Sequence, residues 1–424
     1  MYIYVVQTGD TIEEFADNFG VSVEKLIIDN GIENPDNLLV GRAIVIAYPS
    51  EIYVVKEGDT LSSIATSNDI TVNELLRNNP FIIESPYIYP GEVLTISYNR
   101  SSRMAVYGYA NSFIDRQTLR KTLPYLTFLS VYDYIIGENG ETIGSGNDID
   151  MVQMAIEHGV IPLLHLATIT VQGVADLELT SRVLHEEDLQ DRIFENVLEV
   201  LKDKGYYGVI ISEQLIDSEN DDLFYNYTKS EGYMTLIAID PKISTNNGVV
   251  TFEPIDYARL SEVVYSILLL EYTWGVIDEP PSPVFSTHNV STFLDTILPS
   301  VSPDKITIGI PLLGYIWSLP YVPGLTYGNS ITIENVLTLA ELYDVTIQFD
   351  EESQTPFYFI DDTDIGDGIN IVWYVYTLTI NSLTKILVEN NVPAIGIWNI
   401  MSFFPSLWLV INSQYEIIKL LPEF

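Results

Sequence analysis

The sequence predicts a closed (β/α)8 barrel preceded by two small α+β units, each with the order strand, helix, helix, strand. Two observations support this fold class. Eight apolar, β-prone segments alternate with helical segments over residues 103–424, which is typical of a parallel sheet covered on both faces. Before residue 99, one sequence pattern occurs twice in succession. Eight parallel strands joined by helices fit a TIM barrel.

The duplicated unit covers residues 1–48 and 51–98. In the first copy, Ile12, Phe15 and Phe19 have the spacing of one apolar helical face. Thr11 followed by Glu14 is typical of a helix N-terminus. Each copy also has a Gly-Asp-Thr triplet, an asparagine and a late glycine. These positions are Gly9, Asp10, Thr11, Asn30 and Gly41 in the first copy and Gly58, Asp59, Thr60, Asn79 and Gly91 in the second.

The barrel follows a short polar linker, which we expect at residues 99–102. A small insertion is expected between the seventh and eighth strands, near residues 318–367, where shorter strand-like pieces occur. The eight expected strands are residues 104–109, 126–134, 160–167, 208–214, 233–240, 263–272, 306–313 and 394–399.

The excess of acidic residues argues against polyanions as partners of this chain. With 59 acidic and 19 basic residues, the formal net charge of −40 opposes binding to nucleic acid and to anionic membranes. Two interpretations of the acidity stay open: simple solubility, or an assembly that forms when protonation or divalent cations remove the repulsion. Nearly half of the residues are hydrophobic, so a large core is expected.

No cofactor and no metal site are predicted. The chain has no cysteine, so it has no thiolate ligands, and its four histidines lack metal-ligand spacing and are expected in the core or at the surface. The N-terminus lacks a basic stretch before an apolar one, so no secretory signal is expected. No uncharged apolar run is long enough for a membrane span.

The duplicated unit resembles the LysM domain, a module that binds the N-acetylglucosamine backbone of peptidoglycan or chitin. The Gly-Asp-Thr triplet, the asparagine and the late glycine carry this resemblance. It implies glycan-binding candidates at Gly9, Asp10, Thr11, Asn30, Gly58, Asp59, Thr60 and Asn79. The alternative, that both copies serve only as packing units, stays open at this point.

The barrel region resembles the family 18 glycoside hydrolases, and among them the LysM-bearing cortex-lytic enzymes of spores. The segments that carry this resemblance are residues 126–130, 205–209, 271–275, 309–315, 317–324 and 394–399. The family cleaves glycans with the help of the substrate's own acetamido group. The resemblance implies that a Glu protonates the leaving oxygen while an Asp two residues earlier orients the acetamido group. It assigns Tyr272 to support that group and Trp398 to the floor of the pocket.

Both carboxylates of that motif are replaced in this chain. Within residues 208–215, Ser212 and Gln214 stand where the family has Asp and Glu. Strand alternation places these two side chains on one face and Glu213 on the other. Thr273 replaces a further acidic residue that follows the Tyr in the family. The resemblance therefore predicts a glycosidase fold that has lost its catalytic acid, so enzymatic activity is not expected.

Several aromatic side chains are candidates for binding sugar rings, which requires no carboxylate. Tyr272, Trp274, Trp317 and Trp398 are the candidates, and Trp373 is a weaker one. For Trp317 and Trp373, a place in the core is an almost equally good interpretation.

These observations predict a non-catalytic protein of the spore or parasporal envelope. We expect it to bind peptidoglycan or another N-acetylglucosamine polymer, to act as a self-assembling structural component, or both. It is expected to be made in the mother-cell cytoplasm and to reach the spore coat, exosporium or a parasporal body. The alternative is an active spore peptidoglycan N-acetylglucosaminidase, and a third possibility is a storage or lattice protein without sugar affinity.

Overall fold

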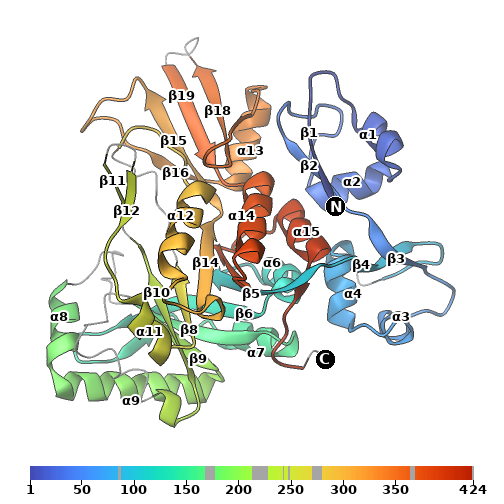
Figure 1. The fold of residues 1–424 in the computed structure, drawn as a ribbon. Helices are drawn as coiled ribbons and strands as arrows, with labels where there is room; N and C mark the ends of the chain where they lie inside the picture. Colours follow the sequence, from blue (N-terminus) through green and yellow to red (C-terminus); the bar gives the residue numbers. More distant parts are fainter. Residues whose placement is uncertain are drawn as a thin grey trace.

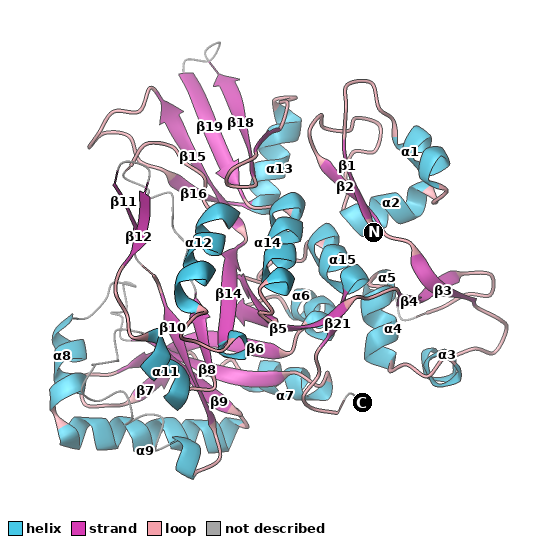
Figure 2. Cartoon of the chain, viewed as in Figure 1, coloured by secondary structure: helices cyan, strands magenta, loops and turns pink. Residues whose placement is uncertain are grey.

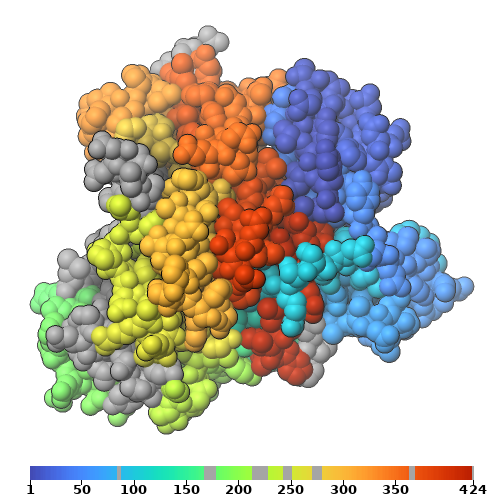
Figure 3. All heavy atoms as spheres, viewed as in Figure 1, coloured from blue at the N-terminus to red at the C-terminus, as the bar shows by residue number. Residues whose placement is uncertain are grey.

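The computed structural model describes residues 1–84, 87–167, 177–212, 228–241, 243–246, 249–269, 279–362 and 368–422. Two small N-terminal modules lie one beside the other along one flank of a larger α/β barrel (Figure 1). An inserted sheet rises from the barrel on the same side as the first module. In the space-filling view the first module, in dark blue, lies directly against this insertion, in orange (Figure 3).

In each N-terminal module the first and last strands pair as a two-stranded antiparallel sheet, and the helices lie between these strands in the sequence. The apolar helical face expected in the first module is buried at Ile12 and Phe15, and Phe19 packs at its edge. The first module consists of β1 (Tyr2–Val5), α1 (Ile12–Phe19), α2 (Val23–Asn30) and β2 (Ala43–Ile46). The second consists of β3 (Pro49–Val54), α3 (Leu61–Ser67), α4 (Val72–Asn78), α5 (Phe81–Glu84) and β4 (Val93–Tyr98).

Eight parallel strands form the closed barrel, because the first strand pairs with both the second and the last. Helices surround these strands on the outside (Figure 2). The barrel strands are β5 (Ser102–Ala110), β6 (Phe128–Ile136), β8 (Ile161–Ala167), β9 (Gly208–Ser212), β10 (Met234–Ile239), β13 (Ser266–Leu269), β14 (Ile306–Pro311) and β20 (Ala394–Trp398).

Strand alternation divides the barrel side chains into two cores. Leu163, Ile210 and Leu236 belong to an interior cluster, whereas Val209 and Ile211 belong to the cluster between strands and helices. The barrel helices are α6 (Arg116–Thr122), α7 (Ile149–Glu157), α8 (Leu177–His185), α9 (Glu187–Lys204), α11 (Tyr257–Val263), α12 (Thr287–Ile297), α14 (Thr377–Glu389) and α15 (Pro405–Gln414). Short additions are β7 (Thr142–Gly144), the hairpin of β11 (Ile243–Asn246) and β12 (Val249–Phe252), β21 (Tyr415–Ile417), and the 3₁₀ turns Leu123–Tyr125 and Pro303–Lys305.

The insertion is a five-stranded antiparallel sheet with one helix, placed between the seventh and eighth barrel strands. It reaches from residue 313 to residue 374, further in both directions than the expected 318–367. Its elements are β15 (Leu313–Leu319), β16 (Asn329–Thr332), α13 (Ile333–Leu342), β17 (Gln348–Asp350), β18 (Thr355–Asp362) and β19 (Gly368–Tyr374).

The predicted fold class is confirmed, and every expected barrel strand is present. The sixth strand begins later than expected, at Ser266, because Tyr257–Val263 is the helix α11. None of the helices in the described part of the chain combines the length and the apolar character that a membrane span requires.

Candidate functional site

Ser212 lies at the carboxyl end of the barrel, where side chains from several strands converge in barrels of this type. Its neighbour in register on the next strand is Ala238, which belongs to the interior cluster, so Ser212 also faces the barrel interior. The Ser212 hydroxyl donates a long hydrogen bond, 3.5 Å, to the carbonyl oxygen of Leu166. The expected direction of this side chain is confirmed, whereas Glu213 and Gln214 lie outside the described residues.

Trp398 ends the last barrel strand and forms part of an aromatic cluster at the same end of the barrel. Its ring centroid is 5.9 Å from that of Tyr109 on β5 and 5.5 Å from that of Tyr132 on β6. Tyr132 also contacts the His165 ring edge-on at 4.8 Å. Trp398 is partly exposed, so its ring is open to a ligand. The role that the resemblance implies for Trp398, as the floor of a pocket, is compatible with this position.

The polar groups of this cluster are held in uncharged forms. Burial lowers the pKa of His165 to about 3, so its imidazole is neutral at physiological pH. Its Nδ1 lies 3.3 Å from the Ser130 hydroxyl. Burial also raises the pKa of Tyr109 well above its usual value, and its hydroxyl has no hydrogen-bond partner in the described chain. The described side chains of the cluster therefore offer aromatic surface and neutral hydrogen-bonding groups.

The other aromatic candidates do not join this cluster in the described structure. Tyr272, Thr273 and Trp274 lie outside the described residues. Trp317 has no exposed surface, and its indole packs closely on Gly328 within the insertion. Trp373 is nearly buried and stacks on Phe357 with 4.4 Å between ring centroids. These contacts favour the interpretation of Trp317 and Trp373 as core residues of the inserted sheet.

In the first module, the Gly-Asp-Thr triplet forms one exposed turn. Gly9 has a φ of +91°, a conformation that suits glycine. The Asp10 carboxylate accepts a hydrogen bond of 2.6 Å from the backbone N–H of Gln7, and Thr11 caps α1 by accepting from the N–H of Glu14. Gly9 and Thr11 are exposed, so the turn is open to a ligand.

The second module repeats this turn. Asp59 accepts from the N–H of Lys56 at 2.7 Å and also from the Tyr53 hydroxyl at 3.0 Å. Thr60 and Ser63 exchange the two hydrogen bonds of a capping box at the start of α3. Gly58, with a φ of +87°, and Thr60 are exposed like their counterparts in the first module. Both triplets are therefore helix-starting turns on the protein surface.

The paired asparagines are buried inside their modules. Asn30 donates to the carbonyl oxygens of Leu26 and Val45, at 3.0 and 2.9 Å, and accepts from the N–H of Val45 at 2.7 Å. Asn79 makes the same three bonds to the residues at matching positions. The exposed fractions of the two residues are 1% and 2%. Each asparagine joins a helix to the closing strand through hydrogen bonds, and its buried side-chain amide is not accessible to a glycan.

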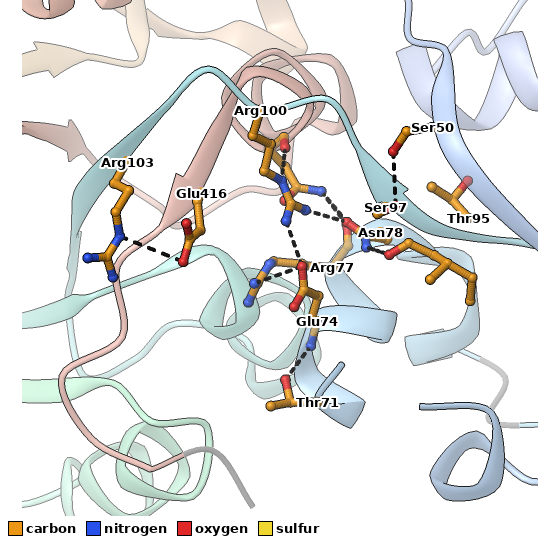
Figure 4. A network of polar contacts seen from close by, with 12 residues as sticks. Ser50, Thr71, Glu74, Arg77, Asn78, Thr95, Ser97, Arg100, Arg103 and Glu416 are labelled. Carbon is orange, nitrogen blue, oxygen red and sulfur yellow. Dashed lines mark hydrogen bonds and ion pairs between the residues drawn. The ribbon is translucent and has the colours of Figure 1, made fainter. Parts of the chain in front are cut away.

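Sequence analysis missed the residues that attach the second module to the barrel. Arg100, which lies in the expected linker, bonds to Glu74 and Asn78 of α4, at 2.6 and 2.9 Å (Figure 4). The same guanidinium donates to the backbone carbonyl and side-chain oxygens of Asn412 on α15. Asn412 is more than 300 positions away in the sequence, so no local pattern indicates this contact.

The first module is attached by close backbone approach. The N–H of Ile347 in the insertion donates to the carbonyl oxygen of Val40 at 2.9 Å. Arg42 is buried, donates to the carbonyl oxygens of Asn30 and Gly31, and lies 3.5 Å from the Glu341 carboxylate on α13. The late glycines, Gly41 and Gly91, belong to the repeat pattern, but no local pattern in the sequence indicates this interface.

The described residues offer no obvious place for a metal. Among them, no group of three or more histidine or acidic side chains is arranged to hold a metal ion.

Comparison with known proteins agrees with this architecture. The LysM domain model matches residues 4–47 and 53–97. The chain is 28% identical to a cortical fragment-lytic enzyme of Bacillus subtilis (strain 168), over 99% of both proteins. The crystal structure of the Bacillus cereus spore cortex-lytic enzyme SleL superimposes with a TM-score of 0.78 at 22% identity, covering 99% of each chain. A Chromobacterium violaceum chitinase matches 73% of this chain and 98% of its own, with a TM-score of 0.63 at 15% identity. This chain thus has two LysM domains followed by a barrel with a chitinase-like fold, and over nearly its whole length it is similar to the cortical fragment-lytic enzymes.

Proposed function

We propose that this protein is a spore-associated, peptidoglycan-binding protein whose barrel binds glycan without cleaving it. Its relatives are named cortical fragment-lytic and spore cortex-lytic enzymes, which supports a peptidoglycan ligand and a location in the spore. The observation that carries the loss of catalysis is Ser212, which faces the barrel interior where the family places a carboxylate.

Replacement of the two carboxylates removes a negative charge and an acidic proton from the site. A serine hydroxyl does not offset the positive charge that develops on the acetamido group, and a glutamine at position 214 has no acidic proton for the leaving oxygen. A positioned general acid contributes about 10²–10⁴ in rate, so its absence alone is severe. His165 does not substitute, because a group with a pKa of about 3 carries no proton to donate near neutral pH.

The features that remain suit binding. Trp398 and Tyr132 offer aromatic surface at the mouth of the barrel, and sugar rings pack on such surfaces without needing a carboxylate. The two exposed turns at Gly9 and Gly58 in the LysM domains provide further glycan contacts, separate from the barrel mouth. Two weak sites on one chain raise the overall affinity for a polymer above that of either site.

A second candidate function is active hydrolysis, as a spore peptidoglycan N-acetylglucosaminidase. The names of the relatives favour it, since the cortical fragment-lytic enzyme of Bacillus subtilis aligns with nearly the whole chain. This candidate requires an acid other than residues 212 and 214. Asp240 follows β10 two residues after the inward-facing Ala238 and is the first acidic residue to remove if activity is found.

The deciding experiment combines sedimentation with an assay of reducing ends. The full-length protein is incubated with purified spore peptidoglycan at neutral pH, with and without a soluble N-acetylglucosamine oligomer as competitor. We expect competed co-sedimentation and no new reducing ends. New reducing ends that disappear in Asp240→Asn would establish the hydrolase instead. Absence of both binding and cleavage would favour the self-assembling role, which titration of pH and calcium then tests.

A gain-of-function variant tests the mechanism of the loss. If the remaining pocket is intact, Ser212→Asp combined with Gln214→Glu restores measurable hydrolysis of cortex fragments. The single variant Gln214→Glu is the control, because it supplies the acid without the carboxylate that orients the acetamido group.

A further inference from the structure

A cleft with a volume of about 500 Å³ lies where four parts of the chain meet. Its walls come from α2 of the first LysM domain, the start of α5 in the second, α13 of the insertion and the segment that leads into α15. None of the Gly-Asp-Thr residues and none of the aromatic residues at the barrel mouth lines it. Among the glycan-binding candidates considered above, Asn30 lines the cleft, but its amide is bonded inside the first module.

Close contacts fix the walls of this cleft. A Cβ on Gly31 would lie 3.3 Å from the Pro405 side chain, so α2 approaches α15 closely. Arg42 joins the end of α2 to Glu341 on α13, as described above. The first LysM domain is held between α13 and α15, so these contacts fix the positions of the walls relative to one another. A preformed site avoids the cost of ordering its walls on binding.

The lining combines aromatic side chains with charged side chains of both signs, because Lys121 and Arg42 line the cleft together with glutamates. Phe403 and Tyr376 are partly exposed side chains of the barrel part, and Phe81 comes from the second LysM domain. The ammonium group of Lys121 lies 5.8 Å from the centroid of the Phe403 ring. Glu33 and Glu334 are exposed on opposite walls, and their carboxylates have no hydrogen-bond or ion-pair partner among the described residues. Apolar surface with a few polar groups at its edge is typical of small-molecule sites.

This lining favours a neutral, amphipathic ligand. Aromatic rings pack on the C–H faces of sugars, while carboxylates accept hydrogen bonds from hydroxyl and amide groups. The net charge of −40 repels anionic ligands. Metal binding has no support here, since no suitable group of ligands occurs among the described residues. A volume of about 500 Å³ falls within the ordinary range for ligands of a few rings.

We propose that this cleft is a composite carbohydrate site that binds two or three units of a neutral N-acetylglucosamine oligosaccharide. The inference rests on the proposed function, because it adds a third contact to a protein that binds peptidoglycan. The site exists only in the assembled protein, since neither LysM domain forms it alone. Attachment of these domains to the barrel then serves binding directly, in addition to holding the modules in place.

The test blocks the cleft from an exposed position. Thr338 lies on α13, is exposed and lines the cleft, so Thr338→Trp fills the space without disturbing a core. The matched control is Asn335→Trp, an exposed position on the same helix that does not line the cleft. Phe403→Ala is a second variant, which removes the floor instead of filling the space.

Two measurements follow, with tetra-N-acetylchitotetraose as the probe. Titration calorimetry of the full-length chain is expected to show at least a tenfold loss of affinity at one site in Thr338→Trp and Phe403→Ala, with no change in Asn335→Trp. Hydrogen–deuterium exchange is expected to show protection of residues 27–33 and 403–405 on addition of the sugar, and loss of that protection in Thr338→Trp.

The outcomes separate this inference from the proposed function. If wild type binds peptidoglycan, and protection by the sugar is confined to the two Gly-Asp-Thr turns or the barrel mouth, the cleft proposal is wrong and the proposed function stands. If wild type binds neither peptidoglycan nor the tetrasaccharide, both are wrong.

Discussion

The two LysM domains share their internal structure but differ in how they are attached to the rest of the chain. Inside each domain, an asparagine makes the same three hydrogen bonds and a Gly-Asp-Thr turn starts the first helix. Outside, the first domain contacts its neighbours through its backbone and a buried arginine, whereas the second is joined by a partly buried network of side chains around Arg100. The repeated motif therefore determines the internal structure of each domain, and residues outside the motif determine where the domain is attached.

The largest difference is expected at the two late glycines. Gly41 and Gly91 both have positive φ angles, +86° and +95°. A Cβ on Gly41 would lie only 2.0 Å from the carbonyl oxygen of Ile347, whereas a Cβ on Gly91 meets no atom within 4 Å. Gly91→Ala is expected to cost about 1–2 kcal/mol from backbone strain alone, and Gly41→Ala about 3 kcal/mol or more.

Urea-induced unfolding of the full-length variants measures both costs. Hydrogen exchange then locates the damage, and we expect faster exchange at the N–H of Ile347 in Gly41→Ala only. Equal costs for the two glycines would show that the first domain moves away from the insertion without penalty, which contradicts the attachment described here.

The asparagines test the internal structure that the two LysM domains share, so the two domains are expected to respond alike to their removal. Asn30→Ala and Asn79→Ala each leave a buried backbone N–H, of Val45 or Thr95, and two carbonyl oxygens without their side-chain partner. An unsatisfied buried group costs about 1–3 kcal/mol, so we expect about 2–4 kcal/mol for each variant. The two values are expected to agree within about 0.5 kcal/mol when measured by chemical denaturation.

A marked inequality between the two asparagine variants would contradict the shared internal structure. If either variant instead lost glycan binding while keeping its stability, the asparagine would belong to a binding surface after all. Its burial argues against that outcome.

The fold could be predicted from sequence because its signals are local. Apolar strands of the right length, helices with one apolar face and the repeated turn each appear within a few residues of one another. The inward direction of Ser212 followed from the alternation of a single strand. These features required no knowledge of which distant segments meet.

The attachments could not be predicted because they join segments that are distant in sequence. Arg100 occurs in a short polar segment that was expected to be a simple linker, and its partner Asn412 lies near the other end of the chain. Trp317 had two interpretations, and only the packing of Gly328 on its indole separates them. The buried asparagines were placed among the glycan candidates, since a repeated polar residue gives the same sequence signal in a core as at a surface.

Arg100 offers a smaller test of the second attachment. Arg100→Ala removes the four hydrogen bonds that Arg100 donates, two to α4 and two to Asn412 on α15. Bonds of a charged group contribute about 1.5–3 kcal/mol where they are partly buried. We expect a total loss of about 2 kcal/mol, because water replaces part of these bonds. Arg103 is the matched control: it lies nearby and is exposed, and its contact with Glu416 is 3.6 Å long (Figure 4).

Arg103→Ala is expected to change stability by less than about 0.5 kcal/mol, as is usual for an exposed ion pair. Limited proteolysis reports the attachment itself, since release of the second domain exposes residues 99–102. If Arg100→Ala is cleaved there no faster than Arg103→Ala, the side-chain network does not hold the domain.

A contribution of histidine to the pH dependence of stability is expected from the barrel and not from the LysM domains. All four histidines occur in the barrel part, and burial lowers the pKa of His165 to about 3. The unfolded chain binds a proton at this residue below about pH 6.5, but the folded barrel does not, so stability falls as pH decreases from about 6.5 towards 3. The slope for one such group is at most about 1.4 kcal/mol per pH unit. Unfolding of His165→Gln, followed from pH 7 to pH 5, is expected to show a correspondingly flatter dependence on pH than wild type. An unchanged slope would mean that the folded barrel takes up the proton, and His165 would then be a possible charged group at the mouth, which would reopen the case for catalysis.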